Sequence, residues 1–318
     1  MRGIGLVFNI YISNKVGTEA IGTFSLIMSV YNFAITIATS GIGIACTYIV
    51  SERFAKKDYI TGINATKTCI WFSVILSLIS GLIIFLAAPM VSASWLKATV
   101  SSVPIYVIAL GLPFIAVSSV INGYFSSVGK SYKGAISQTV EMTMKIVATL
   151  ILLHFNISKG IEYICISLIL GDVISEFFSF SLNMIFYLVD IRKYLNKRST
   201  SLQMKKQIFS ISFPIAITSY IRSGLSSLKQ FLIPIRLEMS GLTYSMAVSQ
   251  YGLINGMVLP VLLYANVFFA SFSSLLVPEF SRLLASKYYK RMKDVCNKIF
   301  KAASLFCICV TGVFFFFS

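Results

Sequence analysis

Apolar stretches follow one another along almost the whole chain, separated by short polar segments. A helix needs roughly 20 consecutive apolar residues to cross the hydrocarbon core of a bilayer. Measured against that length, the 318 residues divide into about nine segments. Their approximate ranges are 3–12, 21–50, 69–91, 104–128, 135–155, 163–189, 208–235, 246–277 and 302–318. We therefore predict an all-α integral membrane protein of about nine transmembrane helices, the first of them incomplete.

The amino-acid composition supports a chain that faces lipid. Only 12% of the residues are charged and 57% are hydrophobic, with a mean hydropathy of +0.83. Soluble domains carry roughly 25% charged residues, because their surfaces must interact with water. A surface with about half that share of charge is typical of a membrane protein.

The positive charges are distributed unevenly over the connecting loops. Of the 27 Lys and Arg residues, 19 lie in the loops after the second, fourth, sixth and eighth segments, and only four lie in the other loops. Cytoplasmic loops of membrane proteins carry such an excess of cations. The alternation places the N-terminus in the cytoplasm. It also explains the net charge of +16 without a nucleic-acid partner, which would require a folded, soluble basic face.

Metal and enzyme sites are not indicated by the pattern of reactive residues. Six cysteines are present, none in C-x-x-C spacing, and the chain has a single histidine, His154. Such a set cannot supply the usual ligands of a zinc or two-metal centre. No nucleophile–histidine–acid grouping or glycine-rich phosphate loop is visible either. We expect neither a metal, nor a cofactor, nor an enzymatic activity.

Ionisable residues inside the apolar segments are the candidate functional residues, because burying a charge in the bilayer costs about 2.5–3.5 kcal/mol on insertion scales. Glu141 and Lys145 are one helical turn apart and form either a structural pair or part of a cavity wall whose lysine meets a diphosphate. Arg222 and Lys229 share one face of a segment without acids, which suits an anionic ligand. Lys229 alternatively extends to the outer interface.

Two further acids, Asp172 and Glu176, are also one turn apart within a single apolar segment. They suggest a site that couples transport to a proton or another ion. A salt bridge to Arg222 or Lys229 is the alternative.

Several stretches resemble the stage V sporulation protein B family. That family belongs to the multidrug/oligosaccharidyl-lipid/polysaccharide exporter superfamily and is related to lipid II flippases. The similar stretches are 41–45 with Glu52 and Arg53, 122–125, 135–138, 141–145, 213–214, 225–228, 234–237 and 251–257. The resemblance covers nearly the whole chain, in the order of the family.

The resemblance implies two lobes of helices around a central cavity. This chain would hold a first lobe at 1–190, a basic cytoplasmic linker at 191–207 and part of a second lobe at 208–318. The implied function is a flippase of a lipid-linked oligosaccharide or peptidoglycan precursor, with a link to sporulation cell-wall synthesis. Its partners would be a lipid-linked anionic saccharide and anionic membrane lipids. The implied cavity includes Gln138 beside Arg222, Lys229, Lys145 and Glu141.

Two alternatives remain open. A multidrug or cation antiporter of the same superfamily would use a cavity dominated by Glu141, Asp172 and Glu176. A membrane scaffold without transport activity would bind other envelope proteins. The short first segment and the run of phenylalanines at 314–317 also suggest a fragment or a frameshifted reading of a longer protein.

The alternation of loop charges makes a direct prediction about topology. In variants without the native cysteines, a membrane-impermeant thiol reagent applied from outside should label Lys97→Cys and leave Lys197→Cys unlabelled. Both variants should be labelled after the membrane is made permeable. Labelling of Lys197→Cys alone in intact cells would contradict the orientation.

Overall fold

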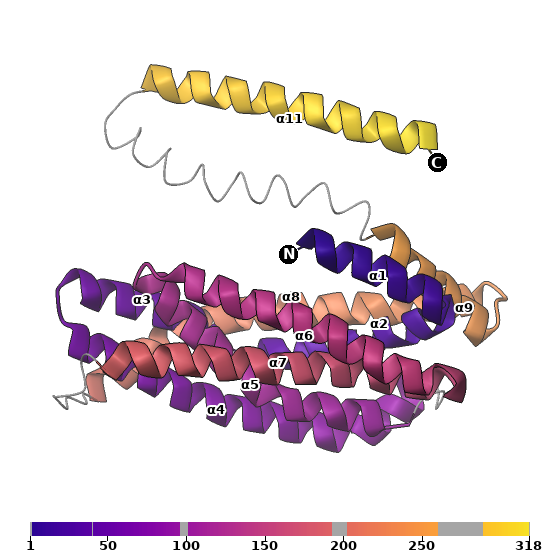
Figure 1. Cartoon of the computed structure of the whole chain (residues 1–318), viewed down its shortest axis with the longest axis horizontal. Helices are drawn as coiled ribbons and strands as arrows, with labels where there is room; N and C mark the ends of the chain where they lie inside the picture. The colour runs from indigo at the N-terminus through magenta and orange to yellow at the C-terminus, as the bar shows by residue number, and fades with distance from the viewer. Residues whose placement is uncertain (1, 40, 96–100, 193–201, 260–288, 318) are drawn as a thin grey trace. The chain divides into compact units, whose positions relative to one another are not determined.

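The computed structural model describes residues 2–39, 41–95, 101–192, 202–259 and 289–317, and these ranges are almost entirely helical, with no strand among them (Figure 1). The helices are α1 (Arg2–Val16), α2 (Thr18–Thr39), α3 (Ile42–Ala55), α4 (Tyr59–Met90), α5 (Val103–Ser127), α6 (Ser131–Asn156), α7 (Ile161–Ile191), α8 (Leu202–Met239), α9 (Tyr244–Gly252) and α11 (Tyr289–Phe317). Short π-helical segments follow α4 and α9, at Val91–Trp95 and Leu253–Val258, and a 3₁₀ turn, Ile157–Lys159, follows α6. Gly3–Gly256 and Met257–Ser318 are separate compact units.

Seven spans among the described residues are long and apolar enough to cross a membrane. They are Thr18–Ala55, Tyr59–Ala93, Val103–Ser127, Ser131–Lys159, Ile161–Ile191, Ile208–Met239 and Tyr289–Gly312. The predicted first segment lies in α1, a helix of 15 residues. The predicted eighth begins in α9 and runs into residues outside the described ranges. The all-helical membrane fold is confirmed, whereas the count of nine stays a prediction, as do the lobe boundaries at 190 and 208.

The second predicted segment lies within one candidate span, Thr18–Ala55, which contains the two helices α2 and α3. Gly41 precedes α3 with a φ of 68°, in the left-handed region that glycine adopts most easily. The next turn ends at Asp58, whose carboxylate accepts a hydrogen bond from the Thr61 amide at 3.3 Å and caps α4.

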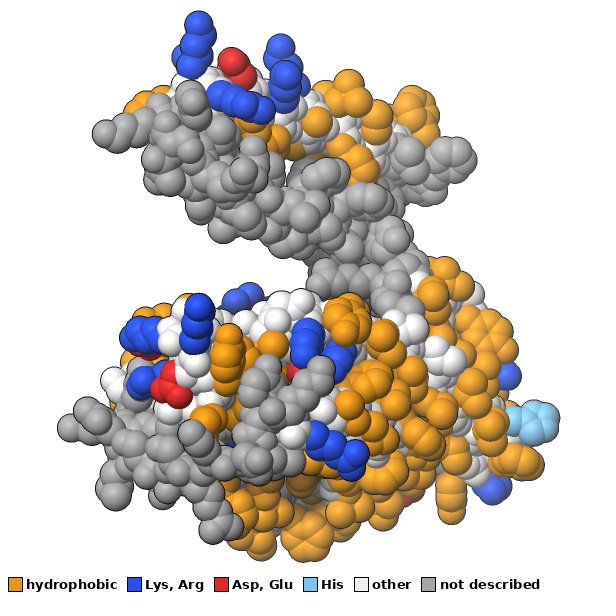
Figure 2. Space-filling model, turned by 60° about the vertical axis from the view of Figure 1, so that its left-hand side comes forward, with side chains coloured by type: hydrophobic (Ala, Val, Ile, Leu, Met, Phe, Trp, Pro, Cys, Tyr) orange, Lys and Arg blue, Asp and Glu red, His pale blue; other side chains and the backbone are white. Residues whose placement is uncertain are grey.

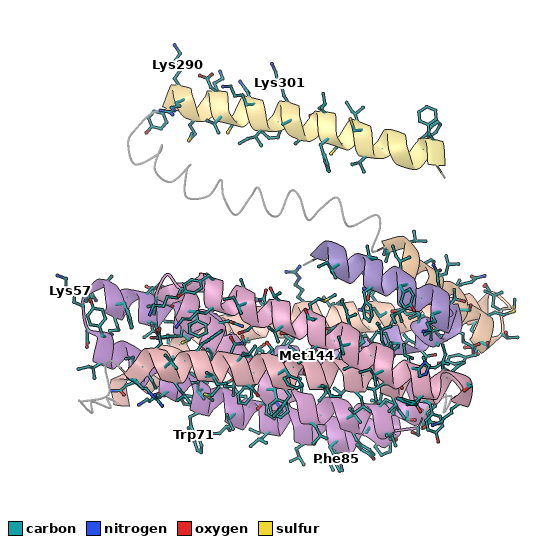
Figure 3. All side chains as sticks on the ribbon, viewed as in Figure 1. Lys57, Trp71, Phe85, Met144, Lys290 and Lys301 are labelled. Atoms are coloured by element: carbon teal, nitrogen blue, oxygen red, sulfur yellow. The ribbon has the colours of Figure 1, made fainter. Side chains whose placement is uncertain are left out.

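The faces of α4 show how the unit Gly3–Gly256 is adapted to lipid. Trp71 and Phe85 are exposed on its outer side, whereas Ser73, Ser77 and Ser80 are buried against other helices (Figure 3). Small hydroxyl residues let helices approach closely where lipid offers no hydrophobic drive for association. Hydrophobic side chains accordingly cover the flank of the molecule in Figure 2, and Lys and Arg side chains gather on the end turned toward the viewer.

Helix α2 is at the centre of this unit, where it packs against α4, α5, α7, α8 and α9. Its neighbour α3 crosses α5 at Gly43 and Gly123. A methyl group on Gly123 would lie 2.5 Å from the carbonyl oxygen of Gly43. Hydrogen bonds from Ser127 to the Thr47 carbonyl at 2.9 Å, and from Thr47 to the Gly123 carbonyl at 3.3 Å, reinforce the crossing. The α3–α5 distance therefore depends on the absence of a side chain.

Gly123→Ala should lower the melting temperature of the detergent-solubilised protein, because the added methyl group forces α3 and α5 apart at a cost of about 1–3 kcal/mol. Gly81→Ala in α4 is the matched control. There the methyl group would meet only the Ala109 carbonyl oxygen at 3.5 Å, an ordinary contact. Equal melting temperatures for the two variants would contradict the tight crossing.

Candidate functional site

A polar cavity of about 900 Å³ opens between α2, α3, α5 and α8. Most of its lining residues carry a hydroxyl or amide group: Asn32, Thr36, Thr39, Thr47, Ser119, Asn122, Ser126, Ser219, Ser223 and Ser226. The remaining described lining residues are Ile35, Gly41, Gly43, Ile44, Gly123 and Ile215, together with one charged residue, Arg222. The cavity is therefore a largely neutral, hydrogen-bonding chamber with a single guanidinium.

Hydrogen bonds between α8 and α2 hold the wall that carries Arg222. The Thr36 hydroxyl donates to the Ser223 hydroxyl at 3.0 Å, one residue beyond Arg222. Four residues further along α8, the Ser227 hydroxyl donates to the Ser29 carbonyl at 2.9 Å. These contacts set the rotation of α8 about its axis and turn its serine-rich face toward the cavity.

Arg222 has no ion-pair partner within the part of the chain that the structure describes. Its neighbours on the same helix face are the hydroxyls of Ser219, Ser223 and Ser226. A guanidinium in a membrane-spanning helix requires water, an acid or an anionic ligand to balance its charge. An anion in the cavity would meet this requirement.

The other residues expected in the cavity lie elsewhere. Lys229 and Gln138 are exposed and do not belong to the lining of the cavity. Glu141 and Lys145 also lie outside it and join a second polar cluster with Asp172 and Glu176. Only Arg222 among the predicted substrate-binding residues lines the cavity.

The second cluster, which we call the acid cluster, contains Glu141 and Lys145 from α6, Asp172 and Glu176 from α7, and Tyr31 from α2. The Lys145 ammonium pairs with the Asp172 carboxylate at 2.5 Å. The sequence suggested other ion pairs, Lys145 with Glu141 and Asp172 with Arg222 or Lys229. Among the described residues, Lys145 pairs with Asp172 instead. This pair forms because α6 and α7 approach closely where Gly171 contacts the Thr149 side chain, one turn beyond Lys145.

Glu176, the second α7 acid of the cluster, binds Tyr31 of α2. The Tyr31 hydroxyl lies 2.6 Å from both carboxylate oxygens and donates a hydrogen bond to Glu176. Gly111 of α5 leaves the space for this contact, because a methyl group there would lie 2.8 Å from Glu176 Oε2 and 3.0 Å from the Tyr31 hydroxyl. Glu141 has its own hydrogen-bond partner in Ser179.

Several of these residues were missed by sequence reasoning. Tyr31, Ser179 and Gly111 are ordinary residues of apolar helices, and no spacing pattern marks them. The cavity residues Gly43, Asn122 and Gly123 fall in stretches used for the family resemblance, but their place in the cavity wall depends on the packing of α3 against α5.

The loop lysines Lys130 and Lys133, used above to assign topology, form a separate ion-pair group. Their ammonium groups lie 2.7 Å and 3.0 Å from Asp190 Oδ1, at the end of α7. Lys133 also lies 5.5 Å from the ring centroid of Phe125. This group ties the α5–α6 turn to the end of α7.

The fold defines a multi-pass helical membrane protein, and the cavity lies within its helices. A model of the family described as "Polysaccharide biosynthesis protein" matches residues 1–284, and the chain belongs to this family.

Among curated proteins, the chain is 25% identical over 293 residues to stage V sporulation protein B of Bacillus subtilis (strain 168), covering 90% of this chain and 56% of that protein. It is 28% identical over 155 residues to the lipid II flippase MurJ of the same organism, covering 46% of this chain and 28% of that protein. The chain thus spans about half of the first relative's length and less of the second's.

Solved transporters of the MOP superfamily share the fold. One is a multidrug resistance MATE family transporter in an inward-facing conformation, with a TM-score of 0.60 and 16% identity, covering 84% of this chain and 59% of that one. Another, from Pyrococcus furiosus Vc1 (DSM3638), gives a TM-score of 0.55 and 17% identity, covering 83% of this chain and 65% of that one. At these identities the likeness concerns the fold alone.

The ion pair in the acid cluster gives a test by double substitution. Lys145→Met should strand the buried Asp172 carboxylate and lower membrane abundance and melting temperature, because breaking a buried pair costs about 3–5 kcal/mol. Lys145→Met combined with Asp172→Leu should recover most of the loss. Lys159→Met, at an exposed lysine, is the control. A double variant no better than the single one would contradict the pairing.

Proposed function

We propose that this chain forms the substrate-binding part of a flippase that moves a lipid-linked saccharide, such as a cell-wall precursor, across the cell membrane. The observation that carries the proposal is the polar cavity with one unpaired guanidinium. Membership of the polysaccharide biosynthesis family supports it, as do the names of the two Bacillus subtilis relatives.

The lining of the cavity suits the two parts of such a headgroup. Serine, threonine and asparagine side chains both donate and accept hydrogen bonds, as sugar hydroxyls require. Arg222 presents a planar fork of N–H donors that can bind two oxygens of a phosphate or diphosphate at once. The anionic phosphate would in turn balance the charge of Arg222 within the membrane.

The position of the acids separates this proposal from a cation antiporter. An antiporter would bind its cationic substrate against carboxylates in the cavity wall. Here Asp172, Glu176 and Glu141 lie outside the described lining and already have partners in Lys145, Tyr31 and Ser179. A scaffold without transport activity would have no use for a large polar cavity.

The acid cluster is the proposed site of ion or proton coupling. It contains three carboxylates and one ammonium, so its charges are not balanced and a carboxylate can take up a proton. Tyr31, which binds Glu176, directly precedes Asn32 in the cavity wall. A change of charge at Glu176 would therefore act on α2 and through it on the cavity. We further propose that the N-terminus is cytoplasmic. The segment 191–207 would be a basic cytoplasmic linker that connects the two lobes along the chain.

Arg222→Ala tests the proposal. Membrane abundance should stay normal, while binding of a labelled lipid-linked saccharide diphosphate to vesicles should weaken by about 10–100-fold, the loss of a charge-assisted contact of about 1.5–3 kcal/mol. Arg222→Lys should rescue only in part, because an ammonium lacks the two-pronged geometry.

The matched control is Lys229→Ala, which removes an exposed cation from the same helix outside the cavity. It should bind the substrate as the unsubstituted chain does. A loss of abundance in step with binding in Arg222→Ala would assign Arg222 a structural role and overturn the proposal for it.

A further inference from the structure

A second hollow of about 220 Å³ lies against the other side of α8, between that helix and α3 and α4. Its walls are almost wholly apolar and include Ile42, Phe72, Leu76, Phe213 and Ala216. We call this hollow the apolar groove. Ser212 is one of its few polar residues, and its hydroxyl already donates to the Ile208 carbonyl at 2.8 Å. The groove therefore suits a hydrocarbon chain and offers little to a headgroup.

The apolar groove and the polar cavity are neighbours that share two elements. On α8, Ile215 faces the cavity, while Phe213 and Ala216 face the groove. At the start of α3, Gly41 lines the cavity and Ile42 lines the groove. The contact between α8 and the start of α3 lies between the two spaces.

The start of α3 and α8 approach closely at this contact. A methyl group on Gly41 would lie 2.8 Å from Ile215 Cγ2 and 3.4 Å from the Ser212 carbonyl oxygen. Gly41 has a φ of 68° and stands at the turn between α2 and α3.

We propose that the apolar groove holds the first part of the polyprenyl chain of the lipid whose saccharide diphosphate lies in the cavity, with the chain crossing between Gly41 and Ile215. This inference rests on the proposed function. A headgroup in a polar chamber and a tail in hydrocarbon require a lateral passage between the two. At about 220 Å³ the groove is roughly a quarter of the size of the 900 Å³ cavity, so it suits one narrow chain rather than a pair of acyl chains.

The test uses a photoreactive benzoylphenylalanine at Phe213, in the groove, with the full chain in vesicles and a radiolabelled polyprenyl diphosphate saccharide. Leu225, an exposed residue of α8 outside both hollows, is the matched position. We expect cross-linking at Phe213 and little at Leu225. Excess unlabelled polyprenyl diphosphate saccharide should abolish the signal, whereas diacyl phospholipid should not.

Ala216→Phe supplies a second measurement, because the ring fills the groove. It should weaken binding of the polyprenyl substrate about tenfold, as expected when one or two buried methylenes are displaced at about 0.8 kcal/mol each. Leu225→Phe should have no effect. Equal binding by both variants, or cross-linking that phospholipid competes away, would overturn the inference and leave an ordinary lipid contact.

A separate arm distinguishes this inference from the proposed function. A tail-less saccharide diphosphate should protect Ser223→Cys, in the cavity wall, from alkylation. Protection of Ser223→Cys without cross-linking at Phe213 would refute the binding of the polyprenyl chain in the groove, and the proposed function would still hold. If neither protection of Ser223→Cys nor cross-linking at Phe213 is observed, both the tail-binding groove and the proposed function are refuted.

Discussion

Close approach of helix backbones at small residues is the constraint on which the rest of the structure depends. Lipid tails are as apolar as leucine, so helices in a bilayer gain little from burying apolar side chains and associate through van der Waals packing and hydrogen bonds instead. The Gly43–Gly123 crossing sets the distance between α3 and α5, and the Gly171–Thr149 contact sets that between α6 and α7. The first contact shapes the cavity wall, and the second brings Lys145 to Asp172.

Helix α2 connects the two polar regions that result. Its residue Tyr31 binds Glu176 of the acid cluster, and the next residue, Asn32, lines the cavity. One turn further, Thr36 binds Ser223 on α8, beside Arg222. In the proposed function, a proton taken up by the acid cluster would act on the same helix that lines the proposed substrate cavity. This connection is a physical route for coupling, because a helix transmits a rotation or displacement along its length.

The charges within the membrane-spanning helices divide into paired and unpaired groups. Lys145 forms an ion pair with Asp172, and Glu176 accepts a hydrogen bond from Tyr31, which limits the cost of burying these charges. Arg222 is the exception among the cavity-lining residues, and its need for an anion agrees with a phosphate-bearing substrate. The apolar groove adds the complementary surface for a hydrocarbon tail. Together they support the proposed site for an amphiphile rather than for a water-soluble solute.

The sequence by itself determined the membrane class, the family and most of the helices, because these depend on local hydrophobicity, loop charge and motif order. It also marked Arg222, since a cation among apolar residues is conspicuous wherever the helix packs. It did not determine that Lys145 pairs with Asp172 or that Tyr31 binds Glu176. Those contacts join residues on different helices, and only the rotation and spacing of packed helices bring them together. The same holds for the cavity and the groove, because a hollow belongs to several helices at once and leaves no pattern in any one of them.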